Sequence, residues 1–187
     1  GYLAVGLAWI LVSVLGMLPY LISGDIPRVE DALFESVSGF TTTGATVLKD
    51  IEHMSRSGMF WRLFTQWIGG MGVLVFMMAV MPMGGEHSMH IIRAEFPGPT
   101  VGKLVPRAGQ TAKILYLIYV SMTALETGLL MLGGLSFYDA LLHAFATAGT
   151  GGFSTLNASL GGFHSIYVET VAAVFVLLFS VNFHLYY

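Results

Sequence analysis

The chain has 187 residues, of which 55% are apolar and only 10% are charged, and its net charge is −3. Soluble domains usually carry about 25% charged residues, so this composition indicates a membrane protein whose main partner is lipid. The absence of cysteine excludes disulfides and thiolate metal sites, and the weak negative charge gives no basic surface for nucleic acid.

The first part of the chain predicts a helix, a short helix, a loop and another helix. Gly1–Ile22 carries no charge and is long enough to span about 30 Å of hydrocarbon. Asp31–Phe40 is too short to span, so we interpret it as a re-entrant pore helix, which Thr41–Thr46 follows as extended backbone. A second span is expected at Met59–Met81, with Arg62 near its start reaching the lipid headgroups.

The rest of the chain predicts a linker and then the same order of elements. Residues 83–113 contain three prolines and four basic residues and are expected to form an aqueous linker. A third span is expected at Ile114–Leu135. A second pore helix at Asp139–Ala148 and its loop, Gly149–Thr155, come before a fourth span at Ser165–Tyr187.

The two short helices and their loops follow one sequence pattern. Asp31–Thr46 recurs 108 positions later, without a gap, as Asp139–Ser154. Two spans separate the copies, so both loops should lie on one face of the membrane and the repeats should be parallel. We therefore expect an all-α membrane protein with two repeats, 1–82 and 114–187, joined by the linker 83–113. Basic residues number four on each side, so the positive-inside rule gives no orientation.

The pattern of the loops is typical of an ion filter built from backbone carbonyl oxygens. Glycine reaches positive φ without steric cost, which explains Gly44 and Gly152. Thr42 and Thr150 precede them, and a threonine hydroxyl can add a ligand. The pore helices end at the loops, where their partial negative charge favours a cation. The candidate filter backbone also includes the residues after each glycine: Ala45, Thr46, Phe153 and Ser154.

Four stretches of the chain carry a family resemblance: ALFESVSGFTTTGATVL, QWIGGMGVLVFMMAVMP, RAEFPGP and ATAGTGGFSTLNASLG. They are similar to the Trk/Ktr/HKT superfamily of potassium transporters, and within it to the Trk-type bacterial uptake subunits. In that family four M1–P–M2 repeats surround a potassium pathway whose filters face outward. The resemblance implies that this chain is half of such a pore and lacks the later, gate-bearing repeat. The potassium-coordinating residues that it implies are Thr42, Thr43, Thr150 and Gly151.

The resemblance also implies a function, partners and a location. The function would be potassium uptake, with K⁺ as the transported ion, and the chain would not be an enzyme. The intact subunits would pair as homodimers under the control of a cytosolic nucleotide-binding regulatory subunit. The location would be the bacterial inner membrane, crossed several times. The acidic residues on the loop side would then lie near the outer mouth: Asp25, Glu30, Asp31, Asp50 and Glu52.

Three questions stay open from the sequence. An intramembrane enzyme could use Ser38 or Ser154 with a histidine, although no nucleophile elbow is present and the repeat would have no explanation. A structural membrane subunit that transports nothing is the other alternative. Glu126, about halfway through the third span, could lie on the ion path or be hydrogen-bonded behind the filter, to His143 or to the pore-helix backbone, and we favour the second interpretation.

Overall fold

The computed structural model describes residues 2–72 and 108–181. Within these two ranges the chain folds into helices and loops and contains no strand, so the prediction of an all-α fold is confirmed for them. The elements in chain order are α1 (Tyr2–Gly16), α2 (Leu18–Ser23), α3 (Val29–Phe40), α4 (Arg56–Gly70), α7 (Ala108–Leu132), α8 (Phe137–Ala148), the 3₁₀ helix η1 (Ser159–Phe163) and α9 (Ile166–Ser180).

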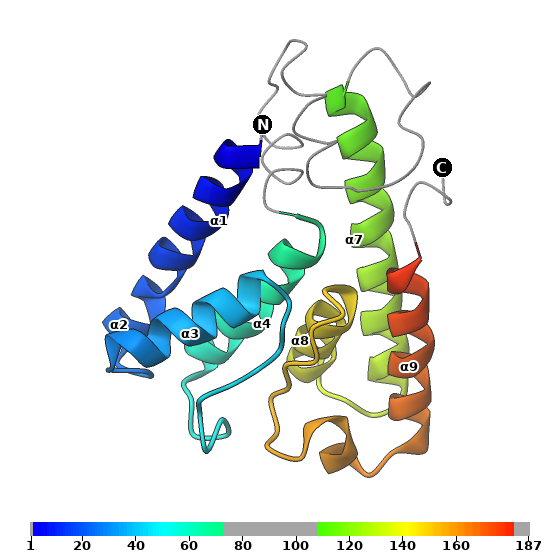
Figure 1. Ribbon diagram of the computed structural model, residues 1–187. Helices are drawn as coiled ribbons and strands as arrows, with labels where there is room; N and C mark the ends of the chain where they lie inside the picture. Colours follow the sequence, from blue (N-terminus) through cyan, green and yellow to red (C-terminus); the bar gives the residue numbers. More distant parts are fainter. Residues whose placement is uncertain (1, 73–107, 182–187) are drawn as a thin grey trace.

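The short helices α3 and α8 lie between longer helices (Figure 1). Helix α1 forms one flank of the molecule, and α7 and α9 run side by side along the other. Helix α4 packs against both α3 and α8 and so joins the first part of the chain to the second. The chain segments after α3 and after α8 both run to the lower end of Figure 1, whereas α1 and α7 begin at the upper end.

Helices α1 and α2 together occupy the first predicted span. Val5–Ser23 is long and apolar enough to cross a membrane, as is Lys113–Leu132 of α7. The helix is interrupted at Met17. Pro19 explains the interruption, because it has no N–H to donate and its ring crowds the carbonyl of Leu15, four residues earlier.

The other two predicted spans are described only in part. Helix α4 begins at Arg56, slightly before the expected Met59, and the part of that span after residue 72 lies outside the described residues. Helix α9 begins at Ile166, one residue after the expected start, and is apolar but shorter than a full span in the described range. The predicted linker, 83–113, also lies outside the described residues, except that its last six residues belong to the start of α7.

The two short helices each begin two residues earlier than expected. Each has 12 residues and is therefore about 18 Å long, too short to cross about 30 Å of hydrocarbon. Ser136 caps α8 by accepting a hydrogen bond from the Asp139 N–H at 3.1 Å. The first turns of both helices carry acidic residues, which the positive end of the helix dipole stabilises: Glu30, Asp31 and Asp139.

An aromatic cluster fixes α4 against α7 and α8. The ring centroid of Trp67 lies 5.3 Å from that of Phe145 and 5.5 Å from that of Tyr119. The Trp67 indole N–H donates to the Thr123 hydroxyl at 3.1 Å, and the Tyr119 hydroxyl donates to the Trp67 carbonyl at 2.9 Å. With both polar groups of these rings bonded, the cluster holds α4 in one position between the two loops.

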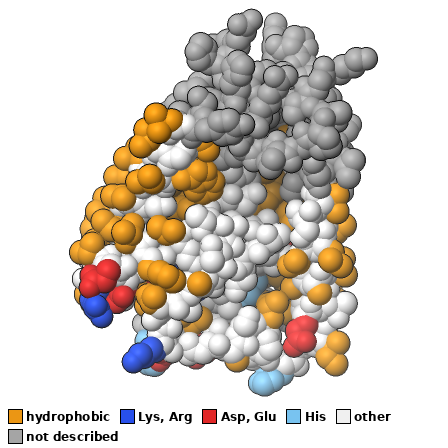
Figure 2. Space-filling view, viewed as in Figure 1, with side chains coloured by type: hydrophobic (Ala, Val, Ile, Leu, Met, Phe, Trp, Pro, Cys, Tyr) orange, Lys and Arg blue, Asp and Glu red, His pale blue; other side chains and the backbone are white. Residues whose placement is uncertain are grey.

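The outer surface of the flanking helices is apolar (Figure 2). Hydrophobic side chains cover both flanks in this view, whereas charged and histidine side chains gather at the lower end. A soluble protein rarely exposes so continuous an apolar surface, so these faces suit lipid or further helices. The large exposed residues on the flanks include Leu3, Leu7, Ile10 and Leu11 of α1, Leu117, Leu125 and Leu132 of α7, and Ile166, Val174 and Leu177 of α9.

Candidate ion-filter site

The loop after α3 begins with a tight turn closed by two hydrogen bonds. The Thr42 N–H donates to the carbonyl of Gly39 at 3.0 Å, and the Thr43 N–H donates to the carbonyl of Ser38 at 2.9 Å. This pairing is the Schellman motif, in which the first N–H groups beyond a helix satisfy its last carbonyls. The motif directs the chain out of the helix and into the loop at Thr42.

The loop after α8 repeats this turn at the equivalent positions. The Thr150 N–H donates to the carbonyl of Thr147 at 2.8 Å, and the Gly151 N–H donates to the carbonyl of Ala146 at 3.0 Å. Each of these four residues lies 108 positions after its counterpart in the first turn. The duplication seen in the sequence therefore extends to the backbone hydrogen bonds.

Both loops hold two residues in the left-handed region of backbone conformation. The φ angles are 74° at Gly44 and 80° at Gly152, which confirms the expectation of positive φ at these glycines. Thr42 and Thr150 also have positive φ, at 54° and 52°. A Schellman turn normally places glycine at this position, and a β-branched residue there is strained by about 1–3 kcal/mol. Such strain persists where the surroundings enforce it, and it is typical of functional sites.

The two loops approach each other at Gly44. A Cβ atom added to Gly44 would overlap the carbonyl oxygen of Gly151, and one added to Gly151 would overlap the side chain of Gln66. At Gly152, by contrast, a Cβ would meet no atom within 4 Å. Gly44 is therefore required by both its conformation and its close contact, whereas Gly152 is required by its conformation alone.

A buried carboxylate supports the first loop from behind. Glu35 on α3 is fully buried. Its Oε1 accepts hydrogen bonds from the Val47 N–H at 2.8 Å and from the Thr46 hydroxyl, and its Oε2 accepts from Arg62 Nε at 3.1 Å. Hydrogen bonds to an ionised group are the stronger kind, so Glu35 fixes the end of this loop firmly.

A histidine occupies the equivalent position behind the second loop. His143 on α8 lies 108 positions after Glu35, and its Nε2 is 2.9 Å from the Ser154 hydroxyl, as Glu35 bonds Thr46 in the first loop. Its Nδ1 is 2.8 Å from the carbonyl of Asp139, which can only accept, so we assign the ring proton to Nδ1. Nε2 then accepts the hydroxyl proton of Ser154.

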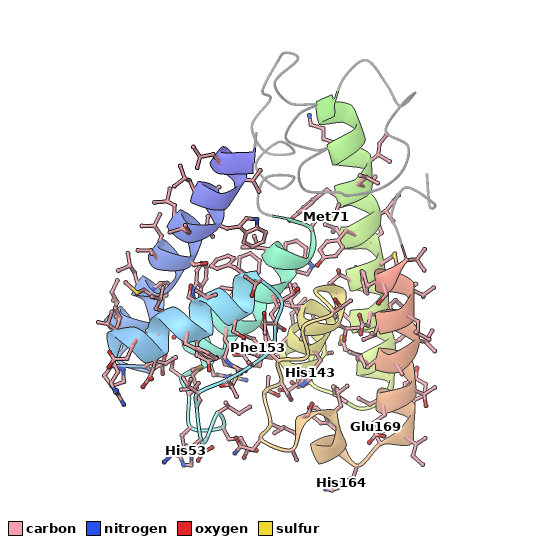
Figure 3. All side chains as sticks on the ribbon, in the orientation of Figure 1. His53, Met71, His143, Phe153, His164 and Glu169 are labelled. Atoms are coloured by element: carbon pink, nitrogen blue, oxygen red, sulfur yellow. The ribbon has the colours of Figure 1, made fainter. Side chains whose placement is uncertain are left out.

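Arg62 does not reach the lipid headgroups, so that expectation is wrong. Its side chain is only 2% exposed and forms an ion pair with Glu35. Its Nη1 donates to the carbonyl of Ser154 at 3.2 Å, and its guanidinium carbon lies 3.6 Å from the centroid of the Phe153 ring. Carboxylate, carbonyl and ring together replace water around the guanidinium, which makes the buried position tolerable. Figure 3 shows Phe153 and His143 in the middle of the molecule, near α8.

Hydrogen bonds divide the candidate filter carbonyls into two groups. The carbonyl of Ala45 accepts from the Ser38 hydroxyl at 2.6 Å, and that of Ser154 accepts from Arg62. These two carbonyls, at the far end of each loop, are directed at protein donors. Within the described ranges the carbonyls nearer the helix ends accept no hydrogen bond: those of Thr42, Thr43, Gly44, Thr150, Gly151 and Gly152.

Glu126 on α7 is not bonded to His143, which was one of the two partners that we expected for it. Both ring nitrogens of His143 are occupied by the carbonyl of Asp139 and by Ser154. Glu126 is fully buried close to Thr147, yet neither of its oxygens has a hydrogen-bond partner among the described residues. It therefore lies beside the last turn of α8.

Sequence reasoning missed the residues that support the loops. Glu35 was passed over as part of the polar face of the short helix, and Gln66 was not considered. A usable signal was present: Glu35 is the one charge inside α3 beyond its first turn, and Arg62 is the one charge inside α4 beyond its first turn. Two opposite charges in neighbouring apolar helices predict a buried pair, because neither is tolerated alone in lipid.

Comparison with known proteins decides the family. The model of the TrkH family, described as cation transport protein, matches residues 1–187. The chain belongs to this family. The TrkH crystal structure from Vibrio parahaemolyticus matches it with a TM-score of 0.81 and 38% sequence identity, covering all of this chain and 37% of that one. The superfamily resemblance given by the four sequence stretches is thereby confirmed.

Relatives of this TrkH-family chain are considerably longer than the chain itself. It is 42% identical over 190 residues to the Trk system potassium uptake protein TrkH of V. parahaemolyticus, and 38% identical over 189 residues to TrkG of Escherichia coli K12. Both alignments cover all of the chain but only 39% of the relative. The chain therefore spans about two fifths of the length of these relatives. The family consists of transport proteins rather than enzymes.

Proposed function

We propose that the intact protein takes up potassium across the bacterial inner membrane, and that this chain supplies two loops of the selectivity filter. The observation that carries the proposal is the pair of identical turns, each with a strained threonine, in which six backbone carbonyls have no donor among the described residues. A dehydrated cation in a membrane needs oxygen ligands in place of water, and free carbonyls supply them. The relatives are named as potassium uptake proteins, which supports K⁺ as the ion.

The ion would lie near the ends of α3 and α8 rather than at the far ends of the loops. The carbonyls of Ala45 and Ser154 already bind Ser38 and Arg62, which makes them poorer ligands. The carbonyls after the helices accept no hydrogen bond from residues 2–72 and 108–181, and the negative ends of two helix dipoles favour a cation beside them. The proposed potassium ligands therefore remain those given by the family motif: Thr42, Thr43, Thr150 and Gly151.

The proposed architecture is two parallel M1–P–M2 repeats, which make half of a four-repeat pore. Helices α1 to α4 would form one repeat, α7 to α9 the other, and the segment 83–113 a cytoplasmic linker. A filter that surrounds an ion needs loops on all sides, and the greater length of the relatives supports further repeats. Their names as parts of a Trk system support additional components, which we propose to be a second copy and a cytosolic nucleotide-binding subunit. Mass measurement of the intact complex, purified from membranes, tests both.

Rubidium uptake into vesicles that contain the full-length protein tests the function. The wild type should take up rubidium, and unlabelled K⁺ should compete far better than Na⁺. The double variant Gly44→Ser, Gly152→Ser should lose this preference before it loses expression, because side chains at positive φ displace the carbonyls. An unchanged K⁺/Na⁺ ratio in a well-expressed double variant would contradict the filter assignment.

A further inference from the structure

Two polar side chains of α4 reach the second loop from the first part of the chain. Arg62 and Gln66 lie four residues apart and so share one face of the helix. Both are buried, with 1% and 0% exposure. Arg62 donates to the carbonyl of Ser154, and the Gln66 Oε1 accepts from the Phe153 N–H at 3.1 Å. Two consecutive residues of the second loop are therefore bonded to a helix of the first part of the chain.

These bonds determine where neighbouring carbonyls point. In a trans peptide the N–H and the C=O point in opposite directions. Because the Phe153 N–H points at Gln66, the Gly152 carbonyl of the same peptide points away from α4. The Ser154 carbonyl points toward α4, at Arg62. The hydrogen bonds of α4 therefore leave the Gly152 carbonyl available to an ion and hold the Ser154 carbonyl against the protein.

The same arginine is also connected to the first loop. Arg62 donates to one oxygen of Glu35, whose other oxygen holds the Val47 N–H and the Thr46 hydroxyl. A continuous path of hydrogen bonds therefore runs from Val47 in the first loop through Glu35 and Arg62 to Ser154 in the second. A shift of either loop would have to break a buried charge-assisted bond.

Arg62 and Gln66 together form a brace between the two loops. The matching positions on α9 carry no polar residue. Counted from the N-cap serines of α4 and α9, Arg62 and Gln66 correspond to Ala172 and Val176. These small and apolar residues line a cavity of about 290 Å³ together with Gly152. The brace therefore belongs to α4, which is bonded to the second loop and connected to the first, and it is not repeated on α9.

We propose that Arg62 and Gln66 are positioning residues that couple the two filter loops and set the preference for K⁺ over Na⁺. The inference rests on the proposed function. A filter prefers the larger ion only if its oxygens cannot close around the smaller one, and the brace resists that closure because it spans both loops.

Arg62→Lys in the full-length protein tests the coupling. Lysine keeps the charge but has no planar fork, so it can bond Glu35 or the Ser154 carbonyl but does not reproduce both bonds and the ring contact. We expect the K⁺/Na⁺ preference, measured as the ratio of the inhibition constant of Na⁺ to the apparent KM for K⁺, to fall about tenfold, as for one lost charge-assisted bond. The matched control is Arg28→Lys, because Arg28 is exposed and pairs only with surface carboxylates. It should change nothing.

Hydrogen exchange in the same full-length proteins gives a readout that does not depend on transport. Arg62→Lys should speed exchange in both loop segments, 41–48 and 150–156, while Gln66→Met should speed it at the Phe153 amide. Should Arg62→Lys fold poorly, Gln66→Met, which keeps length and adds no buried charge, still has to lower the K⁺/Na⁺ ratio. Faster exchange in one segment only, or a reduced maximal rate with an unchanged ratio, would overturn the coupling. Absence of rubidium uptake by the wild type would instead contradict the proposed function, and exchange would then decide the coupling alone.

Discussion

The two candidate filter loops have the same backbone conformation but are supported by different side chains. Both leave their helices through the same hydrogen-bonded turn, with threonine and glycine at positive φ. Behind the first loop stands the ion pair of Glu35 and Arg62, whereas the neutral His143 and Ser154 stand behind the second. The backbone conformation is therefore duplicated, whereas the side chains that support the loops differ between the two copies.

The largest expected effect of this difference is on stability. Glu35→Ala removes one partner of a buried ion pair and leaves Arg62 uncompensated, which costs about 3–5 kcal/mol. His143→Ala removes a neutral partner and should cost about 1–3 kcal/mol. Thermal unfolding of the full-length protein in detergent measures both. The control is Glu30→Ala, an exposed carboxylate whose loss should leave the unfolding midpoint almost unchanged. Equal losses for Glu35→Ala and His143→Ala would show that the charge is unimportant.

The two glycines provide a second way to separate the loops. Gly44→Ala should lose most of its uptake and its preference for K⁺ over Na⁺, since its new methyl group overlaps the Gly151 carbonyl as well as requiring positive φ. Gly152→Ala adds a methyl group into open space, so its cost is only the strain of about 1–2 kcal/mol that alanine has at positive φ. Its transport should fall but remain measurable in the same rubidium assay. Equal inactivation of the two variants would mean that the contact between the loops does not contribute.

The sequence predicted the features that the two loops share but not the residues that support the loops. The in-register repeat, its threonines and its glycines are local, and they predicted the helix ends and the positive φ of Gly44 and Gly152 correctly. Positive φ at Thr42 and Thr150 was not predicted, because local preference assigns that position to glycine. The turn forms nevertheless because the surrounding structure imposes it.

The supports escaped prediction because they depend on contacts that are distant in the sequence. Arg62 was assigned to the headgroups on the rule that a basic residue near the end of a span extends toward water. Its actual partners, Glu35 and Ser154, are 27 and 92 residues away. For Glu126 we expected a hydrogen bond to His143 or to the pore-helix backbone, but both ring nitrogens of His143 are bonded to other groups. Pairing unlike charges across spans would have found the first of these contacts.

The strained threonines should behave alike in the two loops, which tests whether the backbones are truly equivalent. Thr42→Gly and Thr150→Gly each remove a β-branched residue from the left-handed region. Each should therefore raise the unfolding free energy by up to about 1 kcal/mol, while transport falls because a hydroxyl near the proposed ion is lost. Unfolding midpoints and rubidium uptake of the two variants provide the measurement. A stability gain in only one loop would indicate that the strain is not shared.

The smallest expected effect concerns a clasp that joins the outer ends of both loops. Asn157 donates its side-chain N–H to Asp50 at 2.9 Å, accepts from the Ile51 N–H at 3.0 Å, and donates its backbone N–H to Glu52 at 3.0 Å. The hydrogen bond from Asn157, followed by that from His53, lowers the pKa of Asp50 below its ordinary value of 3.8. The clasp therefore joins the two loops through exposed and half-buried groups beyond the candidate filter.

A lowered pKa gives this clasp a defined dependence on pH. A carboxylate whose pKa is lower in the folded than in the unfolded protein stabilises the fold above its ordinary pKa of 3.8, and this contribution is lost as the pH falls through the lower, folded value. Asn157→Ala should therefore lower the unfolding midpoint slightly at pH 7, and its difference from the wild type should shrink below about pH 4. His53→Ala is the matched control, since it removes the weaker partner of the same carboxylate and leaves the contacts between the loops intact. If the difference caused by Asn157→Ala stayed constant down to pH 3, its backbone contacts rather than the Asp50 carboxylate would hold the two loops together.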